Sequence, residues 1–490
     1  MAVKDTTTSQ TRGLRRNAIG LREVLFQSIT DMAPGAAIAA SIPAGVAFAA
    51  GSLPLAVIFA LVACLFCAVS IGLLAREMPS AGSLATYAAR GLHPAIGFLV
   101  AWGYVLVGFL IPPLVLLQLG FTTAATINAE WSSYPASLWW PWALAGAVIV
   151  LAAGFYGIRT SARLGTVLGM FEIGVFLVLA VFFVVHAGSN NTLSVFTTKY
   201  TPPGFRGITG IIGGSVYTIL AFGGFEGAAP LAEEARNPRR IIPRAVLLAT
   251  LLIGLLYVFT TYAVDVAYGP AKFGSFTTGT GAASWEGMAR SLYGLFWFFV
   301  FLAIVNSTIA NANAGVNVSS RTAYAMGRIG AFPRFLAQVH PKHHSPALAI
   351  VTGFVITVAV TLGLGLGYGP TVAFVMVATA LVIVLAAIYI VMNAACIGFF
   401  ARAARRPNPV LWLVIPILGI ITFVPAWLTS AGIKAFSFVA PLSPPYSYLG
   451  PGVAGWMVAG LIYLLYLYRR DPRRVVEVGL VHLDPLEEYE

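Results

Sequence analysis

Residues 207–244 carry an acid in an otherwise apolar stretch that could cross a membrane. Gly223 and Gly224 interrupt the helix-compatible run, and Glu226 follows directly. A carboxylate at membrane depth marks a functional site by default, and adjacent glycines predict an unwound helix, which is tolerated only where the backbone lines a protein cavity. Glu226 could bind a cationic amine or carry a proton, because burial favours the neutral acid. The alternative is a carboxylate held by neighbouring helices for structure alone.

A second interruption lies in residues 31–38, DMAPGAAI. Proline removes a helix donor and clashes with the preceding turn, so the alternative here is a simple kink. Interrupted helices at mid-membrane are how secondary transporters build binding sites. We therefore expect the substrate to bind at the two interruptions. Asp31 is expected to be partnered within a cytoplasmic half-helix and not to belong to the site. The expected substrate-binding residues are Ala33, Pro34, Gly35, Ala36, Ala37 and Ile38, and Phe222, Gly223, Gly224, Phe225 and Glu226.

Three further polar residues fall inside apolar stretches. Glu172 lies about two turns into its stretch, where it could serve as a proton relay or ion site, or simply as an acid near the membrane interface. Asn311 and Asn313 could coordinate an ion or substrate; hydrogen bonding between helices is the alternative. We expect ion or proton coupling to involve Glu172, Glu226, Asn311 and Asn313.

Other candidate motifs carry little chemistry. The histidines of residues 340–344 have no cysteine or carboxylate cluster nearby, so we interpret them as part of a loop and expect no metal site. Cys64, Cys67 and Cys396 lie in apolar stretches and are expected to be buried thiols. The chain has no nucleophile–base set, phosphate loop or dinucleotide fingerprint. We therefore expect neither an enzyme nor a cofactor.

The composition is that of a polytopic membrane protein. Of the 490 residues, 59% are hydrophobic and 9% are charged, and the mean hydropathy is +0.86, which no soluble domain of this length shows. Twelve apolar stretches are each near the ~20 residues needed to span a bilayer. They lie at about 22–50, 53–75, 95–124, 138–157, 164–187, 207–235, 243–267, 291–326, 346–367, 371–400, 409–430 and 450–468. We expect the third and eighth to be tilted, because they exceed the bilayer thickness.

Lysine and arginine set the expected orientation. Most of the 29 basic residues fall in the segments that are inside if the N-terminus is inside. The protein is therefore expected to be a multi-pass plasma-membrane protein with both termini in the cytoplasm. The same asymmetry explains the net charge of +12 without a nucleic-acid partner.

The two interruptions lie in the first and sixth spans. Corresponding breaks five spans apart predict an inverted-repeat transporter. The expected organisation has a disordered cytoplasmic tail at 1–20 and a transporter core at 21–430. The core contains repeats at roughly 22–187 and 207–400 and an eleventh helix. An outer loop and twelfth helix at 431–468 and a cytoplasmic tail at 469–490 complete the chain.

Four segments resemble the amino acid–polyamine–organocation transporters. Residues 233–244, EEARNPRRIIPR, resemble the family pattern after the sixth span. Residues 77–87 are similar to the loop between spans 2 and 3, and residues 320–333 and 341–346 to the end of span 8 and beyond. The resemblance covers about residues 20–430. It implies an all-α leucine-transporter fold, with a 5+5 inverted repeat and two further helices.

The resemblance also implies site roles. In the family, the carboxylate of an amino acid meets backbone N–H groups at the first break, and its amine meets carbonyls of spans 1 and 6. The family's Gly-Ser-Gly falls on residues 36–38, whereas the glycine here is Gly35. The aromatic gate of span 6 falls on Leu220, so we expect Phe222 to form any aromatic lid. The lysine that many sodium-independent members place in span 5 corresponds to Glu172.

We predict a secondary transporter that moves an amino acid or related small amine by alternating access, coupled to protons. Its expected partners are this substrate, the co-transported proton or sodium, and the lipid bilayer. A polyamine or amino-alcohol carrier, an exchanger and a sodium symporter are alternatives within transport. A channel or receptor is a more distant alternative, because isolated broken helices favour a carrier.

Overall fold

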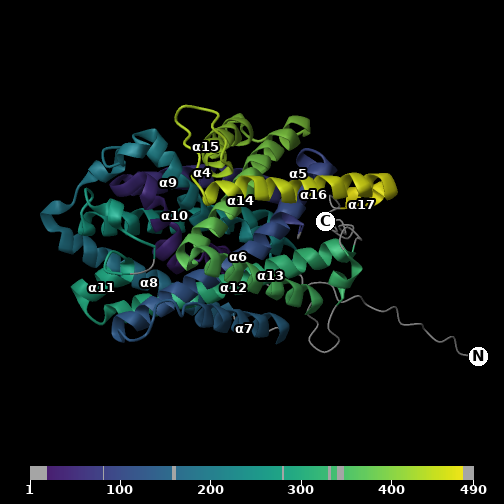
Figure 1. The fold of residues 1–490 in the computed structure, drawn as a ribbon. Helices are drawn as coiled ribbons and strands as arrows, with labels where there is room; N and C mark the ends of the chain where they lie inside the picture. The colour runs from purple at the N-terminus through teal and green to yellow at the C-terminus, as the bar shows by residue number, and fades with distance from the viewer. Residues whose placement is uncertain are drawn as a thin grey trace, which may run out of the picture.

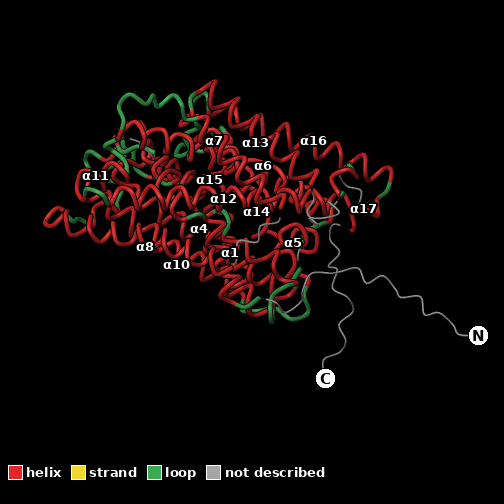
Figure 2. The backbone as a smooth tube through the Cα atoms, turned by 90° about the horizontal axis from the view of Figure 1, so that it is seen from below, coloured by secondary structure: helices red, strands yellow, loops and turns green. Residues whose placement is uncertain are grey.

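The computed structural model describes residues 19–80, 82–156, 162–278, 281–328, 333–338 and 347–477. These residues form helices joined by turns and loops, and their single β-bridge joins Ile19 to Ala235. Helices α5 (Ser83–Gly91) and α17 (Pro472–Glu477) lie at one end, and α11 (Trp285–Tyr293) lies at the other (Figures 1 and 2). We call these ends the α5 face and the α11 face. The histidines of 340–344 and most of both expected tails lie outside the described residues.

Ten helices of the described residues are long and apolar enough to cross a membrane. These spans contain α4 (Leu53–Glu77), α6 (Pro94–Glu130), α8 (Ala162–Ala187), α9 (Ile208–Phe222), α10 (Pro238–Tyr268), α12 (Phe296–Arg328), α13 (Ala347–Tyr368), α14 (Pro370–Arg402), α15 (Ile415–Ala431) and α16 (Leu449–Arg470). The other two of the twelve expected spans are α7 (Trp140–Tyr156), which has 17 residues, and the divided first span.

The eighth span begins later than the sequence pattern predicts. The expected boundary was residue 291, but α11 ends at Tyr293 and α12 starts at Phe296. Gly294 separates them with a φ of 54°, a left-handed conformation that glycine adopts without steric cost. The apolar run therefore covers two helices, because hydropathy does not detect a change of direction at one residue.

The first span is divided at Ala33. Helix α1 (Leu21–Met32) ends there because Ala33 has a left-handed backbone, with φ 47° and ψ 64°. Pro34 then starts a new helical segment, α2 (Pro34–Ala36), which continues into η1 (Ala37–Ser41). Proline suits this first position, since its missing N–H would be unsatisfied there anyway.

The sixth span is divided at the paired glycines. Helix α9 ends at Phe222, Gly224 has a φ of 109°, and η7 (Phe225–Glu233) follows. The break therefore lies at the position that the sequence predicts. Both interrupted spans therefore have backbone groups without intrahelical partners, because helix ends lack them.

Helices that lie five spans apart in the chain pack against each other. Helix α4 packs on α10, α6 on α12 and α7 on α13, and α1 contacts η7 of the sixth span. Two structural repeats of five spans, each packed on its counterpart, explain this pairing. The pairing places the two breaks side by side.

Candidate functional site: a cavity between two interrupted helices

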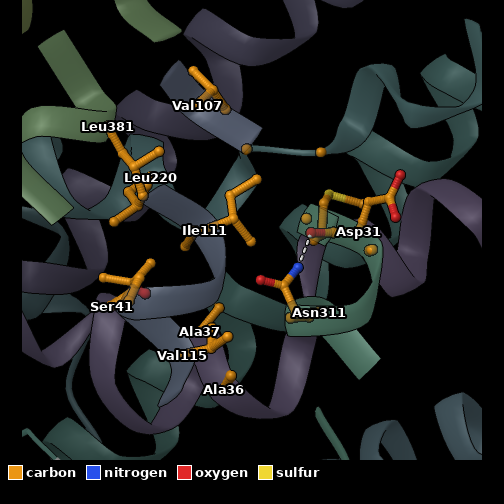
Figure 3. A pocket seen from close by; sticks show the side chains of 18 of the residues that line it. Asp31, Ala36, Ala37, Ser41, Val107, Ile111, Val115, Leu220, Asn311 and Leu381 are labelled. Atoms are coloured by element: carbon orange, nitrogen blue, oxygen red, sulfur yellow. Dashed lines mark hydrogen bonds between the residues drawn. The ribbon is translucent and has the colours of Figure 1, made fainter. Parts of the chain in front are cut away.

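A cavity of about 70 Å³ lies between the two breaks (Figure 3). Residues of both interrupted spans line it, together with the middle of α6, the second half of α12 and α14. Its wall extends along α6 to Tyr104 and along α12 to Val318. Both residues lie in the halves of their helices that are nearer the α5 face, whereas Ser41 and Gln118 line the cavity on the side nearer the α11 face, so the cavity reaches to both sides of the breaks.

The cavity wall is apolar with a few polar side chains, and the ones that can be charged are acidic. Figure 3 shows Val107, Ile111 and Leu381 around it. Its polar side chains are Asp31, Ser41, Tyr104, Gln118, Glu226 and Asn311. Among the described residues that line the cavity, two carry a carboxyl group and none is Lys, Arg or His. A cationic group is therefore the natural electrostatic complement of this cavity.

Glu226 is held by three donors. Its Oε2 accepts hydrogen bonds from the Tyr389 hydroxyl at 3.0 Å and from the Gly224 N–H at 3.2 Å. Its Oε1 accepts a longer bond of 3.4 Å from the Tyr104 hydroxyl. The residue is 2% exposed. One oxygen is thus fixed to the break, while the other has only a long bond that a ligand amine could replace.

Asp31 also lines the cavity, although it was not expected to be a site residue, and it has the partner within its half-helix that the sequence predicts. Its carboxyl group accepts a hydrogen bond from Gln27 at 3.0 Å, and its backbone carbonyl accepts one from Asn311 at 2.6 Å (Figure 3). A signal was present in the sequence. Asp31 precedes its break by two residues, much as Glu226 follows the other, and a carboxylate that close to a helix break points to a site.

The backbone of the two breaks is tied together by side chains from neighbouring spans. The Tyr257 hydroxyl of α10 lies 3.2 Å from the Met32 carbonyl oxygen and 3.0 Å from the Ala221 carbonyl oxygen. Gln118 of α6 donates to the Ala36 carbonyl oxygen at 3.0 Å. A hydroxyl has one hydrogen to donate, so the two carbonyls share it. Sequence reasoning did not identify Tyr257, because nothing in an apolar helix shows which face meets a break.

The family model described as amino acid permease matches residues 23–470. The chain belongs to this family. Relatives of the permease include the low-affinity putrescine importer PlaP of Escherichia coli strain K12, at 32% identity over 312 residues. That match covers 61% of this chain and 65% of the importer, slightly less than two thirds.

Two other relatives cover more of their own length. The branched-chain amino acid permease BcaP of Bacillus subtilis is 24% identical over 344 residues, which are 65% of this chain and 68% of BcaP. An uncharacterized transporter of Mycobacterium tuberculosis strain H37Rv is 27% identical over 455 residues, or 91% of this chain and 92% of that protein. The chain is therefore a multi-pass membrane protein with the all-α, leucine-transporter architecture that the sequence predicts.

Glu172 of the permease lies outside the cavity wall, behind the first break. It is 3% exposed and lies beside Ser307 and Asn306 of α12. A Cβ added to Gly35 would lie 3.1 Å from Glu172 Oε2 and 3.1 Å from the Ala303 carbonyl oxygen. A carboxyl group, a hydroxyl and a backbone carbonyl thus converge on the break, and a proton or a small cation could bind among them.

The remaining expected residues divide between the wall and the packing behind it. Ala33, Ala36, Ala37, Gly223 and Gly224 line the cavity. By contrast, Pro34, Gly35 and Ile38 are buried outside its lining, and Asn313 is half-buried outside it.

The two aromatic residues beside the break of the sixth span pack away from the wall. Phe222 lies edge-on to Tyr257, with ring centroids 5.3 Å apart, and Phe225 lies against Tyr389 at 5.1 Å. Leu220 lines the cavity instead. In this conformation an aliphatic side chain therefore occupies the wall where an aromatic lid was expected.

Proposed function

We propose that this permease carries a small organic amine, either an amino acid or a diamine, across the membrane by alternating access. The observation that carries the proposal is the cavity between the two breaks, where Asp31 and Glu226 are the acidic side chains and no basic one is found among the described residues that line it. A substrate ammonium group would displace the long Tyr104 bond and pair with Glu226 Oε1. The family and the printed functions of PlaP and BcaP support a substrate of this class.

Under this proposal the α5 face lies in the cytoplasm. Most of the basic residues fall in segments on the side of the N-terminus, which supports this orientation through the positive-inside rule. The contacts of Gly45 with Gly214 and of Phe48 with Tyr217 pack the α11 side, so the cavity would then be an inward-facing site. The two interrupted spans would change their packing to expose it to the other side.

Uptake by the purified permease in proteoliposomes tests the proposal. Labelled leucine and labelled putrescine are offered separately, with a pH gradient and a sodium gradient imposed one at a time. We expect saturable uptake of at least one amine, and competition by other amines but not by their des-amino analogues. Equal competition by the des-amino analogues would contradict a site built around a carboxyl group.

A diamine is the second candidate, and Asp31 favours it. An amino acid presents one ammonium and one carboxylate, whereas the cavity offers two carboxyl groups. The two acids stand at the two breaks, and Asp31 lies against Gly224 and Gly227 of the sixth span. Each could pair with one end of a short diamine, which is the substrate type that the name of PlaP prints.

Replacement of Asp31 by asparagine separates the two candidates. If the substrate is a diamine, we expect the apparent affinity for putrescine to fall by about 10- to 100-fold, since a hydrogen bond to a charged group contributes about 1.5–3 kcal/mol. Inhibition by a monoamine of similar length should change little. The measurement is competition against labelled substrate. Glu23→Gln on the same helix serves as the control, because Glu23 caps the start of α1, away from the cavity.

Equal loss for the diamine and the monoamine in Asp31→Asn would contradict the diamine assignment. It would leave the amine assignment of Glu226 intact.

Proton coupling through Glu172 is the mechanism that we propose. The side chain is buried behind the first break, where its neutral form is favoured over a charge with no cationic partner. It could take a proton together with the substrate and lose it when the cytoplasmic side is hydrated. Sodium binding by a charged Glu172 with Ser307 and the Ala303 carbonyl is the alternative.

The Glu172→Gln variant mimics the protonated acid permanently. We expect it to exchange substrate across the membrane at a rate close to that of the wild type, because exchange needs no net proton movement. We expect accumulation under an imposed pH gradient to be lost. Undiminished proton-driven accumulation in this variant would refute the proposed proton coupling through Glu172. Accumulation by the wild type that responds to a sodium gradient alone would favour the cation site.

A further inference from the structure

Asp265 of α10 is a buried acid that the proposed transport cycle does not use. The residue is 0% exposed, and neither of its carboxyl oxygens forms a hydrogen bond with any described residue. Two other buried acids are paired: Glu226 has three donors, and Glu286 accepts from Thr126 and Arg290. Glu172 has one oxygen without a partner, whereas Asp265 has two. An unpartnered buried carboxyl group therefore needs its own explanation.

Asp265 lies where the α11 face is sealed. It is eight residues beyond Tyr257 on α10, or about 12 Å along the helix toward that face. Pro270 follows shortly after the end of the same helix, and its carbonyl oxygen is the atom nearest to the position of a Cβ on Gly51. The end of α10 that carries Asp265 is thus pressed against the turn between the first and second spans.

Further contacts close the same face. The Phe48 ring stacks on Tyr217 at 5.9 Å and lies edge-on to Phe205 at 4.8 Å. A Cβ on Gly45 would lie 2.9 Å from the Gly214 carbonyl oxygen, so the first and sixth spans meet backbone to backbone. The structure therefore combines a cavity between the two breaks with a tightly packed α11 face, and Asp265 is buried at the end of α10 that lies at this face.

No described side chain on the elements packed around this end of α10 offers a cationic partner. Neither η3 (Ala50–Ser52), η5 (Leu193–Phe196), η8 (Phe273–Ser275) nor the first ten residues of α4 contains an acidic, basic or histidine residue. His186 of α8 and Lys272 after α10 are exposed. The other titratable groups nearby are Tyr262 and Tyr268 of α10 itself and Tyr200, which packs in one cluster with Val266, and Lys199 beside Tyr200 is exposed.

The acidic and basic groups of the other elements that contact α10 lie farther from this face. Glu172, Asp31 and Glu226 belong to the level of the breaks, and Arg76 and Glu77 belong to the far end of α4. An ionised carboxylate buried without a partner costs several kcal/mol. Asp265 therefore keeps its proton while the α11 face is packed, and it ionises favourably only when water reaches it.

We propose that Asp265 is a proton-operated switch of the α11 face: protonated, it permits closure, and deprotonated, it favours opening. Acid on that side of the membrane then favours the conformation with the cavity open toward the α5 face. By linkage, a single group can change such an equilibrium by up to about tenfold per pH unit. The switch needs no substrate, so it can be tested independently of the proposed amine transport.

Hydrogen–deuterium exchange of the substrate-free permease in lipid nanodiscs tests the switch. The peptides to follow are 46–52 and 208–217, which form the seal, at pH 6 and pH 9 with exchange times scaled for the intrinsic pH effect. In the wild type we expect these peptides to exchange at least about tenfold faster at pH 9. In Asp265→Asn, a neutral isostere, we expect slow exchange at both pH values.

Two further variants keep the result interpretable. Thr261→Val replaces a buried neighbour one turn away on the same helix with a residue of similar shape, and it should retain the pH response of the wild type. Asp265→Val also lacks a charge, so it replaces Asp265→Asn if that variant folds poorly. Its hydrogen exchange should likewise be slow at both pH values. A wild-type pH response in both Asp265 variants would overturn the proposal. Hydrogen exchange of these peptides that slows with added sodium at constant pH would overturn it as well, in favour of a bound cation.

Discussion

Replacement of Gly224 by leucine is expected to reduce uptake to the level of protein-free vesicles. Gly224 has a φ of 109°, a conformation in which a residue with a side chain is strained by about 1–3 kcal/mol. A Cβ there would also lie 2.5 Å from the carbonyl carbon and 2.6 Å from the carbonyl oxygen of Asp31. Since both atoms belong to backbone, the two interrupted spans would have to separate. The measurement is uptake together with the amount of protein inserted.

Gly174→Leu is the matched control for this prediction. Gly174 also lies within a membrane-spanning helix, but a Cβ there would have no atom within 4 Å. We expect this variant to transport nearly as well as the wild type. If Gly224→Leu were inserted and transported at the wild-type rate, the breaks would not form the substrate site.

Replacement of Glu226 by glutamine is expected to weaken substrate binding at every pH, by about 10- to 100-fold, because a charge-assisted hydrogen bond contributes about 1.5–3 kcal/mol. Glutamine can still accept from the Tyr389 hydroxyl and the Gly224 N–H, which hold the present side chain. The shape of the break is therefore expected to survive while the charge is lost. Equilibrium binding of labelled substrate between pH 5 and pH 9 measures the change.

A different result would assign Glu226 a different role. Intact exchange with loss of the pH dependence would make it the proton carrier, and unchanged uptake with an unchanged pH profile would make it structural. Glu130→Gln is the control, since Glu130 lies at the other end of α6 and pairs with Arg290 on the α11 face. Loss of the Glu130 charge should leave substrate binding unchanged at every pH.

Hydropathy and helix breakers predicted the membrane spans and both interruptions. Apolar runs of about 20 residues have few alternatives to spanning helices, and the pair Gly223–Gly224 breaks the sixth span where expected. The first break falls at Ala33, one residue before Pro34, because a residue that precedes proline is disfavoured in the helical conformation. Local rules of this kind act on neighbouring residues and can be read from one sequence.

The residues of the cavity wall could not be predicted in the same way, because they depend on contacts between helices that are distant in the sequence. Asp31 is partnered by Gln27 within its own helix, as expected, but it also lines the cavity because the sixth span lies against it. Tyr257 reaches both breaks from α10, and Leu220 lines the wall while Phe222 packs behind it. Each of these outcomes depends on how a helix is rotated about its axis, and a uniformly apolar helix gives no periodic signal for that rotation.

The packing of the first span sets an order for assembly during synthesis. Helix α1 packs mainly on α8, η7, α10 and α12, and the earliest of these starts about 130 residues after α1 ends. At about 5–20 residues per second, the ribosome needs roughly 6 to 26 s to reach even that partner. During this time the nascent first span carries Asp31 in the membrane without its final neighbours. Factors that shield polar segments in the bilayer are therefore expected to act on the first span before any other.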